Sequence, residues 1–171
     1  GVSALHEVYA QDVVPYTGRV TVPLLWDMVA DRAVSNESAD IVRMLNDAFA
    51  GDFGGPDLAP EELRDEIDAW NARIYAQVNN GVYRAGFART QAVFVAAVCD
   101  LFGALDGIEA HLAGRDWLCG DRYTEADLRL FPTLARFDVA YHYAFKCNVR
   151  RLMDYPNLWE YARRIYHRPG V

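Results

Sequence analysis

A segment rich in glycine, proline and aspartate divides the chain into two parts with different patterns. It runs from Gly51 to Pro60 and reads GDFGGPDLAP. These residue types favour turns and interrupt regular structure, so the segment predicts a linker. We predict a first part over residues 1–51, a linker over 52–60 and a second part over 61–171.

The first part predicts two short strands followed by a helix. Residues Arg19–Trp26 (RVTVPLLW) are rich in β-branched side chains, and a hairpin-like turn leads to a second strand near Ala33–Ser35. Asn36 and Ser38 are N-cap types, and the apolar residues after them recur at helical spacing. Two short strands and one helix bury too little surface to fold alone. We therefore expect this sequence to be part of a longer chain, with the rest of this domain upstream.

The second part predicts helices almost throughout. An apolar stripe at helical spacing follows Pro60, and Asn79-Asn80-Gly81 predicts the end of that helix. Thr124 and Asp127 resemble a capping box that opens a later helix. The expected apolar stripes of the first two helices are Leu63, Ile67, Trp70, Ile74 and Val78, then Phe94, Val98, Leu101, Leu105 and Ile108, and a last helix is expected over 156–167.

Charge and cysteine content exclude several classes of function. The chain has 17 basic and 24 acidic residues and a net charge of −7, which disfavours a nucleic-acid partner. No window approaches the ~18 apolar residues of a membrane span, and the first residues do not form a signal peptide. Three cysteines without a CxxC motif favour free thiols in a reducing cytoplasm. The four histidines show no ligand spacing, so we expect no metal site. Because no window is apolar enough to span a bilayer, we also expect no membrane partner.

Two dipeptides of the first part are candidates for binding a peptide-like ligand. A cis bond at Val22-Pro23 would turn the main chain of Val22 outward, where it could pair with the ligand as an added strand. Glu37-Ser38 lies at a predicted helix start, where free amides and a hydroxyl suit a carboxylate and Glu37 suits an ammonium group. The alternatives are an ordinary edge-strand proline and an ordinary N-cap.

Tyr83 and the cysteines are the remaining candidates for chemistry. Tyr83 follows the predicted helix break, so its hydroxyl can face a pocket, or the ring can pack between helices. Cys99 falls on or beside an apolar stripe and is expected in the core. Cys119 lies in a turn. Cys147 has cationic neighbours that would lower its pKa, although we favour a structural role for it.

Several longer strings resemble the glutathionyl-hydroquinone reductases, the Xi class of glutathione transferases. They are GRVTVPLLWD, NESADIVRMLN, NNGVYRAGFA, YTEADLRLFPTLARFD, FKCN, DYPNLW and IYHRPGV, in the family's order. The resemblance implies a glutathione-transferase fold, in which a partial thioredoxin-like α/β domain precedes an all-α C-terminal domain. It also implies a homodimer, with glutathione as co-substrate and an aromatic or quinone substrate.

The same resemblance implies roles for the candidate residues. Val22, beside a cis Pro23, pairs through its backbone with the cysteinyl part of glutathione. Glu37 and Ser38 hold the γ-glutamyl end. Tyr83 lines the acceptor pocket and helps to stabilise the hydroquinone oxygen. In the implied reaction a cysteine thiolate attacks the sulfur of a glutathionyl-hydroquinone, and a second glutathione resolves the mixed disulfide.

One departure from the family leaves alternatives open. The family's catalytic cysteine lies in a Cys-Pro-Trp motif on the first helix of the thioredoxin-like domain, and we expect it upstream of Gly1. None of the three cysteines present takes its place. The alternatives are a degenerate relative, a conventional conjugating glutathione transferase, and a non-catalytic module for thiol binding or dimerisation. Arginine far outnumbers lysine, which suggests a high-GC genome and leaves open a low-molecular-weight thiol other than glutathione.

Overall fold

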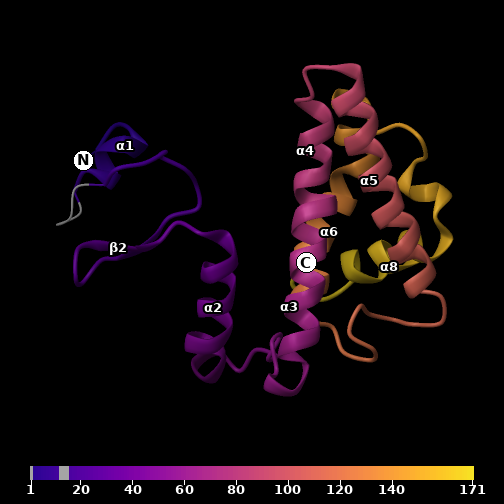
Figure 1. Cartoon of the computed structure of the whole chain (residues 1–171). Helices are drawn as coiled ribbons and strands as arrows, with labels where there is room; N and C mark the ends of the chain where they lie inside the picture. The colour runs from indigo at the N-terminus through magenta and orange to yellow at the C-terminus, as the bar shows by residue number, and fades with distance from the viewer. Residues whose placement is uncertain (1, 12–15) are drawn as a thin grey trace. The chain divides into compact units, whose positions relative to one another are not determined.

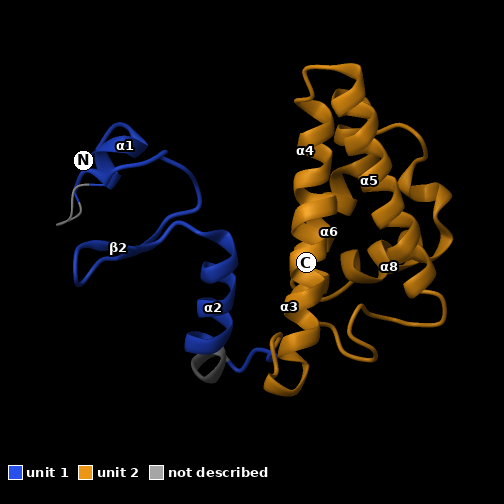
Figure 2. Cartoon of the chain, viewed as in Figure 1, with its two compact units in different colours: residues 1–57 blue, residues 58–171 orange. Residues whose placement is uncertain are grey.

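The chain forms two compact units (Figure 2). The structure is a computed structural model that describes residues 2–11 and 16–171, with the backbone only for residues 50–53. Unit 1 spans residues 1–57 and unit 2 spans residues 58–171. Most contacts of each unit are made within that unit.

Within its described residues, unit 1 contains two helices and a two-stranded antiparallel hairpin (Figure 1). The carboxylate of Asp27 closes the hairpin turn, because its Oδ1 accepts from the amides of Val29 at 2.8 Å and Ala30 at 2.9 Å. These two hydrogen bonds lower the pKa of Asp27. The elements are α1 (Leu5–Tyr9), β1 (Leu25–Asp27), β2 (Arg32–Ser35) and α2 (Ser38–Phe53).

The predicted strand over residues 19–26 was wrong for most of its length, because only Leu25–Asp27 form a strand. In the segment before β1, two backbone carbonyls accept hydrogen bonds from tyrosine hydroxyls instead. Tyr16 donates to the carbonyl of Arg19 at 2.8 Å, and Tyr9 donates to the carbonyl of Thr21 at 2.7 Å. These two hydrogen bonds tie the segment to the rest of unit 1, although it pairs with no described strand. The second strand and the helix after it lie where the sequence predicted them, and α2 continues to Phe53.

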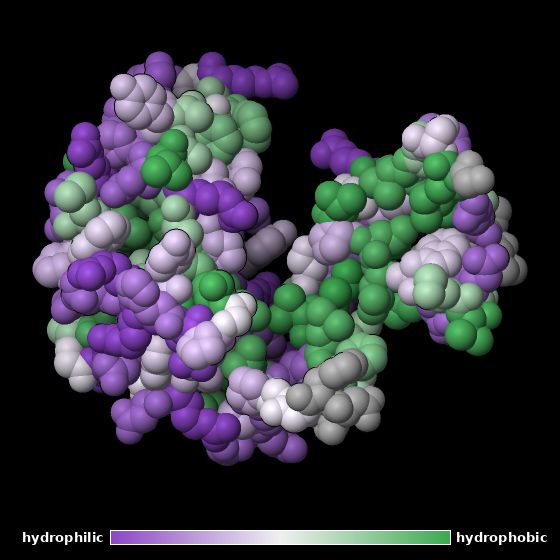
Figure 3. Space-filling model, turned by 180° about the vertical axis from the view of Figure 1, so that it is seen from behind, coloured by the Kyte–Doolittle hydropathy of each residue, from purple (hydrophilic) through white to green (hydrophobic). Residues whose placement is uncertain are grey.

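Unit 1 has a small core. Among its described residues, the buried apolar side chains are Tyr9 and Ile41. Hydrophobic side chains gather instead on the visible surface of this unit (Figure 3). The exposed set includes Met28, Val29, Val34, Met44, Leu45 and Phe49. So little buried apolar surface gives a unit of this size almost no hydrophobic stabilisation of its own.

Unit 2 is helical in its regular structure. A pair of isolated bridges, between Trp117 and Gly120 and between Cys119 and Arg122, shapes the turn before α6. The helical elements are η1 (Glu61–Leu63), α3 (Arg64–Arg73), η2 (Ile74–Asn79), α4 (Asn80–Gly86), α5 (Gln91–His111), α6 (Glu125–Arg136), η3 (Phe137–Tyr141), α7 (His142–Ala144), η4 (Leu152–Asp154) and α8 (Pro156–Tyr166).

The predicted helix end at Asn79-Asn80-Gly81 was wrong. The chain stays helical from Arg64 to Gly86, passing from α3 through the π-helical turn η2 into α4. Contacts with α6 explain this, because Asn79 donates to the carbonyl of Arg129 at 3.1 Å and accepts from the hydroxyl of Thr133 at 2.8 Å. Gly81 is buried within α4 and faces the side chain of Leu101. Tertiary contacts therefore override the local preference of these residues for a break.

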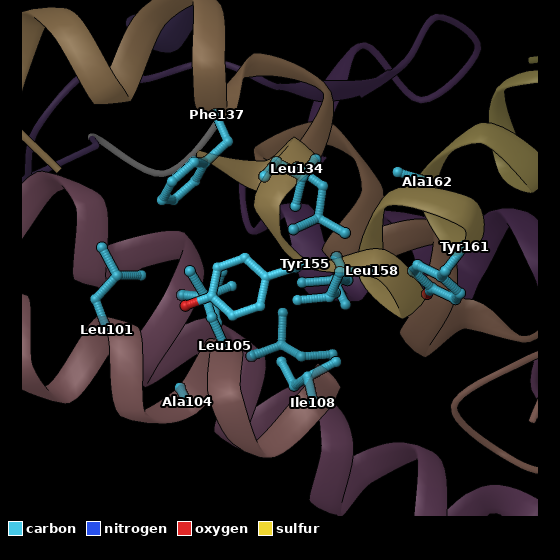
Figure 4. Close-up of a cluster of buried hydrophobic side chains, with 14 of the residues drawn as sticks. Leu101, Ala104, Leu105, Ile108, Leu134, Phe137, Tyr155, Leu158, Tyr161 and Ala162 are labelled. Carbon is cyan, nitrogen blue, oxygen red and sulfur yellow. The ribbon is translucent and has the colours of Figure 1, made fainter. Parts of the chain in front are cut away.

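One part of the core of unit 2 lies where the inner faces of α5, α6 and α8 meet (Figure 4), and Ile67, Ile74, Val78 and Val82 extend it to α3, η2 and α4. The predicted stripe of α5 is confirmed, since Val98, Leu101, Leu105 and Ile108 are buried, and Phe94 is partly buried against the same core. Facing side chains from the later helices are Leu134, Phe137, Tyr155, Leu158, Tyr161 and Ala162. This cluster packs α5 against α6 and α8 within unit 2.

Helix α5 is long and apolar enough to pass a length-and-composition test for a membrane span. Its best 18-residue window has a mean hydropathy of 1.6. The expectation that no window approaches a span was therefore wrong on these criteria. The central helix of a folded core meets the same criteria, and α5 contributes seven buried residues to the core of unit 2.

The predicted capping box at the start of α6 is confirmed. The carboxylate of Asp127 accepts from the amide of Thr124 at 2.8 Å and from its hydroxyl at 3.0 Å. Asp127 also accepts from the amide of Leu118 at 2.9 Å and the hydroxyl of Tyr161 at 2.8 Å. One buried carboxylate thus joins the turn before α6, the start of α6 and α8.

Candidate functional site

The two predicted thiol-binding dipeptides are accessible in unit 1. Val22 is 75% exposed, and Pro23, Glu37 and Ser38 are also exposed. The peptide bond between Val22 and Pro23 is cis, as predicted. Val22 lies outside β1, and its amide and carbonyl make no hydrogen bond within the described residues. Its main chain is therefore free to pair with an extended ligand.

A hydrogen bond brings the two dipeptides to the same place. The side-chain amide of Asn36 donates to the hydroxyl of Thr21 at 3.4 Å. These residues immediately precede Glu37 and Val22 in the chain. The same amide lies 3.4 Å from the hydroxyl of Tyr16. Asn36 was proposed from the sequence only as a cap, so its role as the link between the two segments is visible only in the structure.

Glu37 and Ser38 lie at the start of α2. The carbonyl of Glu37 accepts from the amide of Ile41 at 3.0 Å, while its own amide donates to the hydroxyl of Ser35 at 3.1 Å. The carboxylate of Glu37 forms no ion pair in the part of the chain that the structure describes. A carboxylate beside the first amides of a helix offers opposite charges to the two charged ends of an amino-acid head group.

Tyr83 lies within α4, so the prediction that it falls in irregular structure was wrong. Its side chain is 44% exposed, and its hydroxyl lies 3.3 Å from that of Tyr141, which is 8% exposed. The ring of Tyr83 also contacts those of Phe87, at 6.2 Å between centroids, and Phe145, at 5.3 Å. We call Tyr83, Phe87, Tyr141 and Phe145 the aromatic cluster.

Tyr141 is a residue of this cluster that was not predicted from the sequence. Burial, together with the hydrogen bond to Tyr83, raises the pKa of Tyr141 to about 12. Either hydroxyl can be the donor in this contact, so Tyr141 can donate to the oxygen of Tyr83. Tyr83 then keeps its own hydrogen for an outside acceptor, and a hydroxyl that accepts a hydrogen bond becomes a better donor. Phe137, Tyr141 and Phe145 recur every fourth residue, a spacing that could have revealed their common face.

A glycine lets the aromatic cluster close. A Cβ built on Gly86 would overlap the ring of Phe145. The ring of Phe145 lies 5.5 Å from both Phe87 and Tyr141, measured between centroids. Phe145 thus packs directly on the backbone at the end of α4, and it joins Tyr83 to the segment that carries Tyr141.

The cysteines do not form a reactive centre. Burial raises the pKa of both Cys119 and Cys147 to about 11, so the cationic neighbours of Cys147 do not lower its pKa as expected. Cys99 is exposed on α5, and its expected place in the core was wrong. Only one side of α5 is buried, and successive helix residues are turned by about 100°, so Cys99 faces away while Val98 faces inward. Among the described residues, no three His, Cys, Asp or Glu side chains gather to hold a metal.

The comparisons with known proteins agree with this architecture. The family model described as "Glutathione S-transferase, C-terminal domain" matches residues 59–164, which is most of the chain. The chain belongs to the glutathione S-transferase family. This confirms the predicted fold class, a transferase fold in which the all-α domain follows a partial thioredoxin-like part.

The relatives of this transferase chain include hydroquinone reductases. The glutathionyl-hydroquinone reductase PcpF of Sphingobium chlorophenolicum is 56% identical over 160 residues, which are 92% of this chain and 51% of PcpF. The glutathionyl-hydroquinone reductase YqjG of Escherichia coli is 45% identical over 98% of this chain and 51% of its own length. This transferase chain therefore spans about half the length of the curated relatives it matches, and its resemblance to the Xi class is confirmed.

Solved structures give the same result. The glutathione-bound structure of YqjG matches with a TM-score of 0.93 and 46% identity, over 97% of this transferase chain and 54% of that one. A Xi-class transferase from Natrialba magadii matches with a TM-score of 0.95 and 45% identity, over 99% and 52% of the two chains.

Proposed function

We propose that this chain supplies the thiol-docking and acceptor-binding residues of a glutathionyl-hydroquinone reductase. The observation that carries the proposal is the pair of tyrosine hydroxyls, in which exposed Tyr83 is held at 3.3 Å by buried Tyr141. The surrounding rings offer apolar faces to an aromatic acceptor, and the free hydroxyl hydrogen can meet a phenolic oxygen. The reductases PcpF and YqjG, which resemble nearly the whole chain, support the same class of reaction.

Unit 1 would hold the glutathione. The free main chain of Val22, beside Pro23, suits an antiparallel pairing with the cysteinyl residue of the tripeptide. The start of α2 at Ser38 suits the γ-glutamyl carboxylate, and the unpaired carboxylate of Glu37 suits the ammonium group. The Asn36–Thr21 hydrogen bond supports these assignments, because it keeps the two segments together.

The nucleophile belongs outside these residues. Cys119 and Cys147 are buried with pKa values near 11, and exposed Cys99 lies on a helix of unit 2 with no cation paired to it among the described residues. A catalytic thiolate needs a lowered pKa. We therefore assign the nucleophile to a cysteine in the remainder of the full-length protein, which the relatives' greater length accommodates.

The reaction would proceed in two thiol steps. The cysteine thiolate attacks the glutathionyl sulfur, a Cys–S–S–glutathione bond forms, and the sulfur–ring bond breaks. The ring takes up one proton and leaves as the hydroquinone. A glutathione thiolate then attacks the mixed disulfide, which releases glutathione disulfide and restores the cysteine thiolate. Tyr83 would donate to the acceptor oxygen while negative charge builds on the ring.

Mass spectrometry of the full-length protein tests this reaction. Incubation with glutathionyl-menadiol should release menadiol and add one glutathionyl group to one cysteine, and later glutathione should remove it. A protein that releases no hydroquinone and carries no mixed disulfide would contradict the proposal. Conjugation of glutathione to 1-chloro-2,4-dinitrobenzene without thiol transfer would indicate a conventional transferase instead. Glutathione binding without either reaction would indicate a non-catalytic module.

Location and assembly are part of the same proposal. Glutathione-dependent chemistry needs a reducing compartment, so we place the protein in the cytoplasm, where its three free cysteines persist. We also propose a homodimer in which the helical unit contributes to the interface. Light scattering of the full-length protein tests the dimer, since a monomeric mass at micromolar concentration would exclude it.

A further inference from the structure

A hollow in unit 2 lies beside the aromatic cluster but is lined largely by other residues. It has a volume of about 340 Å³ and sits at the turn between α4 and α5, which Figure 1 shows at one end of this unit. That volume lies at the lower end of the range for small-ligand pockets, roughly 300–1,000 Å³. The lining residues are Ala85, Gly86, Ala88, Arg89, Thr90, Gln91, Phe94, Ala144, Phe145 and Lys146.

The charge of the hollow is positive. Arg89 and Lys146 line it, and its lining contains no acidic residue. Neither cation forms an ion pair within residues 2–11 and 16–171. Some arginines of this unit are paired with carboxylates, as in the contacts of Arg84 with Asp100 and Arg150 with Asp106, whereas these two cations have no such partner among the described residues. Two unpaired cations at one hollow, in a chain with a net charge of −7, make it a local attractor for anions.

The backbone fixes the position of Lys146. Its φ of 55° lies in the left-handed region, which non-glycine residues adopt rarely. The amides on both sides, those of Phe145 and Cys147, each donate to the carbonyl of Tyr141 at 3.2 Å. Cys147 is fully buried, so it anchors the turn. The cation of Lys146 therefore extends from a held backbone rather than from a free loop.

The remaining lining is suited to an aromatic ring. Phe94 and Phe145 are partly buried against the core and offer apolar faces. Thr90 and Gln91 add polar side chains at the rim, although the hydroxyl of Thr90 already accepts from the amide of Val93 at 3.3 Å. Two cations beside apolar rings match a ligand with a flat apolar body and one negative group.

We propose that this hollow is a binding site for small aryl carboxylates. This site goes beyond the proposed function, because binding of an aryl carboxylate needs neither glutathione nor the catalytic thiol. Arg89 and Lys146 hold the carboxylate, and Phe94 and Phe145 contact the ring. Phe145 also belongs to the aromatic cluster, so the two sites share one wall and remain chemically different.

Calorimetric titration of the full-length protein tests the site, with 2-naphthoate as the probe and neutral 2-naphthamide as its isostere. We expect naphthoate to bind at least about tenfold more tightly, since charge-assisted hydrogen bonds exceed neutral ones. The double variant Arg89→Gln/Lys146→Gln should lose that preference. Arg163→Gln removes the same kind of charge on α8, outside the lining residues, and should leave it intact.

Four outcomes would overturn the proposal. Equal binding of the acid and the amide would show that the cations do not contribute. An unchanged preference in the double variant, or an equal loss in Arg163→Gln, would show that the attraction is not local. Weaker binding in Tyr83→Phe would place the acid in the aromatic cluster instead. Arg89 and Lys146 are exposed, so their replacement should leave the far-ultraviolet circular dichroism of the protein unchanged. Thiol-transfer turnover is measured separately from naphthoate binding, so that a failure of the proposed function and a failure of this site are distinguished.

Discussion

The hydroxyl of Tyr83 lies 3.3 Å from the hydroxyl of Tyr141, which joins α4 to η3 across 58 residues of sequence. The two residues differ in exposure, at 44% and 8%, so only Tyr83 is well placed to meet a ligand. Burial and the hydrogen bond to Tyr83 raise the pKa of the buried partner to about 12. In the proposed function, Tyr83 is the donor to the ligand and Tyr141 supports it.

Replacing the two hydroxyls separately should therefore have unequal effects on thiol transfer. Tyr83→Phe removes the donor to the acceptor oxygen and should lower kcat by about 100-fold. Tyr141→Phe removes only the hydrogen bond behind it and should lower kcat by about tenfold. Steady-state turnover of a glutathionyl-hydroquinone measures both. Tyr143→Phe is the control, because Tyr143 is 85% exposed and should have no effect. Equal rates in Tyr83→Phe and the native protein would remove Tyr83 from the mechanism.

Gly86→Ala should destabilise the protein and disturb the aromatic cluster. The added methyl overlaps the ring of Phe145, so the ring or the helix must shift, at a cost of about 1–3 kcal/mol. Gly103→Ala is the matched control, because Gly103 is helical and no atom lies within 4 Å of its built Cβ. That control should instead stabilise by about 0.5–1 kcal/mol. Urea unfolding gives both values, and equal stability of the two variants would contradict the packing described.

Asp127→Ala should cost much more than the loss of one surface charge. The carboxylate accepts from the amides of Leu118 and Thr124 and from the hydroxyl of Tyr161, all buried. Each buried donor left without a partner costs about 1–3 kcal/mol, so we expect about 3 kcal/mol or more in the free energy of unfolding. Asp121→Ala is the control, because Asp121 is exposed and its loss should change that free energy by less than about 0.5 kcal/mol. Similar urea midpoints for the two variants would show that the buried carboxylate does not join these elements.

Glu37→Gln should weaken glutathione binding by about tenfold, since it removes the charge that faces the ligand ammonium. Asp31→Asn is the charge-matched control. Asp31 lies in the hairpin turn, at the other end of β2 from Glu37, and asparagine tolerates its positive φ of 51°. Calorimetry on the full-length protein gives both dissociation constants. Equal weakening by the two substitutions would mean that Glu37 acts only through the net charge.

The three cysteines should react with iodoacetamide at different rates. Cys119 and Cys147 are buried with pKa values near 11, so at pH 8 only about one thiol in a thousand would be ionised even if reagent could reach it. Cys99 is exposed and should be modified first. Peptide mapping by mass spectrometry follows each site, and addition of urea should release the other two. Rapid labelling of Cys147 in the folded protein would contradict its structural role.

Much of the helical unit could be predicted from local pattern. Apolar spacing alone located α5 and its inward face, and the Thr124–Asp127 pair located the start of α6. Both signals act over a few residues, so no distant contact is needed to read them. The thiol-binding dipeptides were also recognisable from their residue types and the strings around them, although their roles in binding remain predictions.

The errors occurred where distant residues decide the structure. Asn79 favours a helix end locally, but its side chain bonds to α6, and the helix continues. Cys99 is apolar and adjacent to core residues, yet the rotation of the helix turns it outward. The segment before Pro23 forms no strand, and two of its carbonyls accept hydrogen bonds from the hydroxyls of Tyr9 and Tyr16.

The sequence by itself determined the order of the elements and the family resemblance, and it nominated the residues proposed to bind a thiol ligand. Only the tertiary structure paired Tyr83 with Tyr141, linked Asn36 to Thr21 and placed Arg89 beside Lys146 at one hollow. The reason is physical. Helical periodicity and capping depend on neighbours three or four residues away, whereas these pairs are separated by 15 to 58 residues and meet only when the helices and loops have packed.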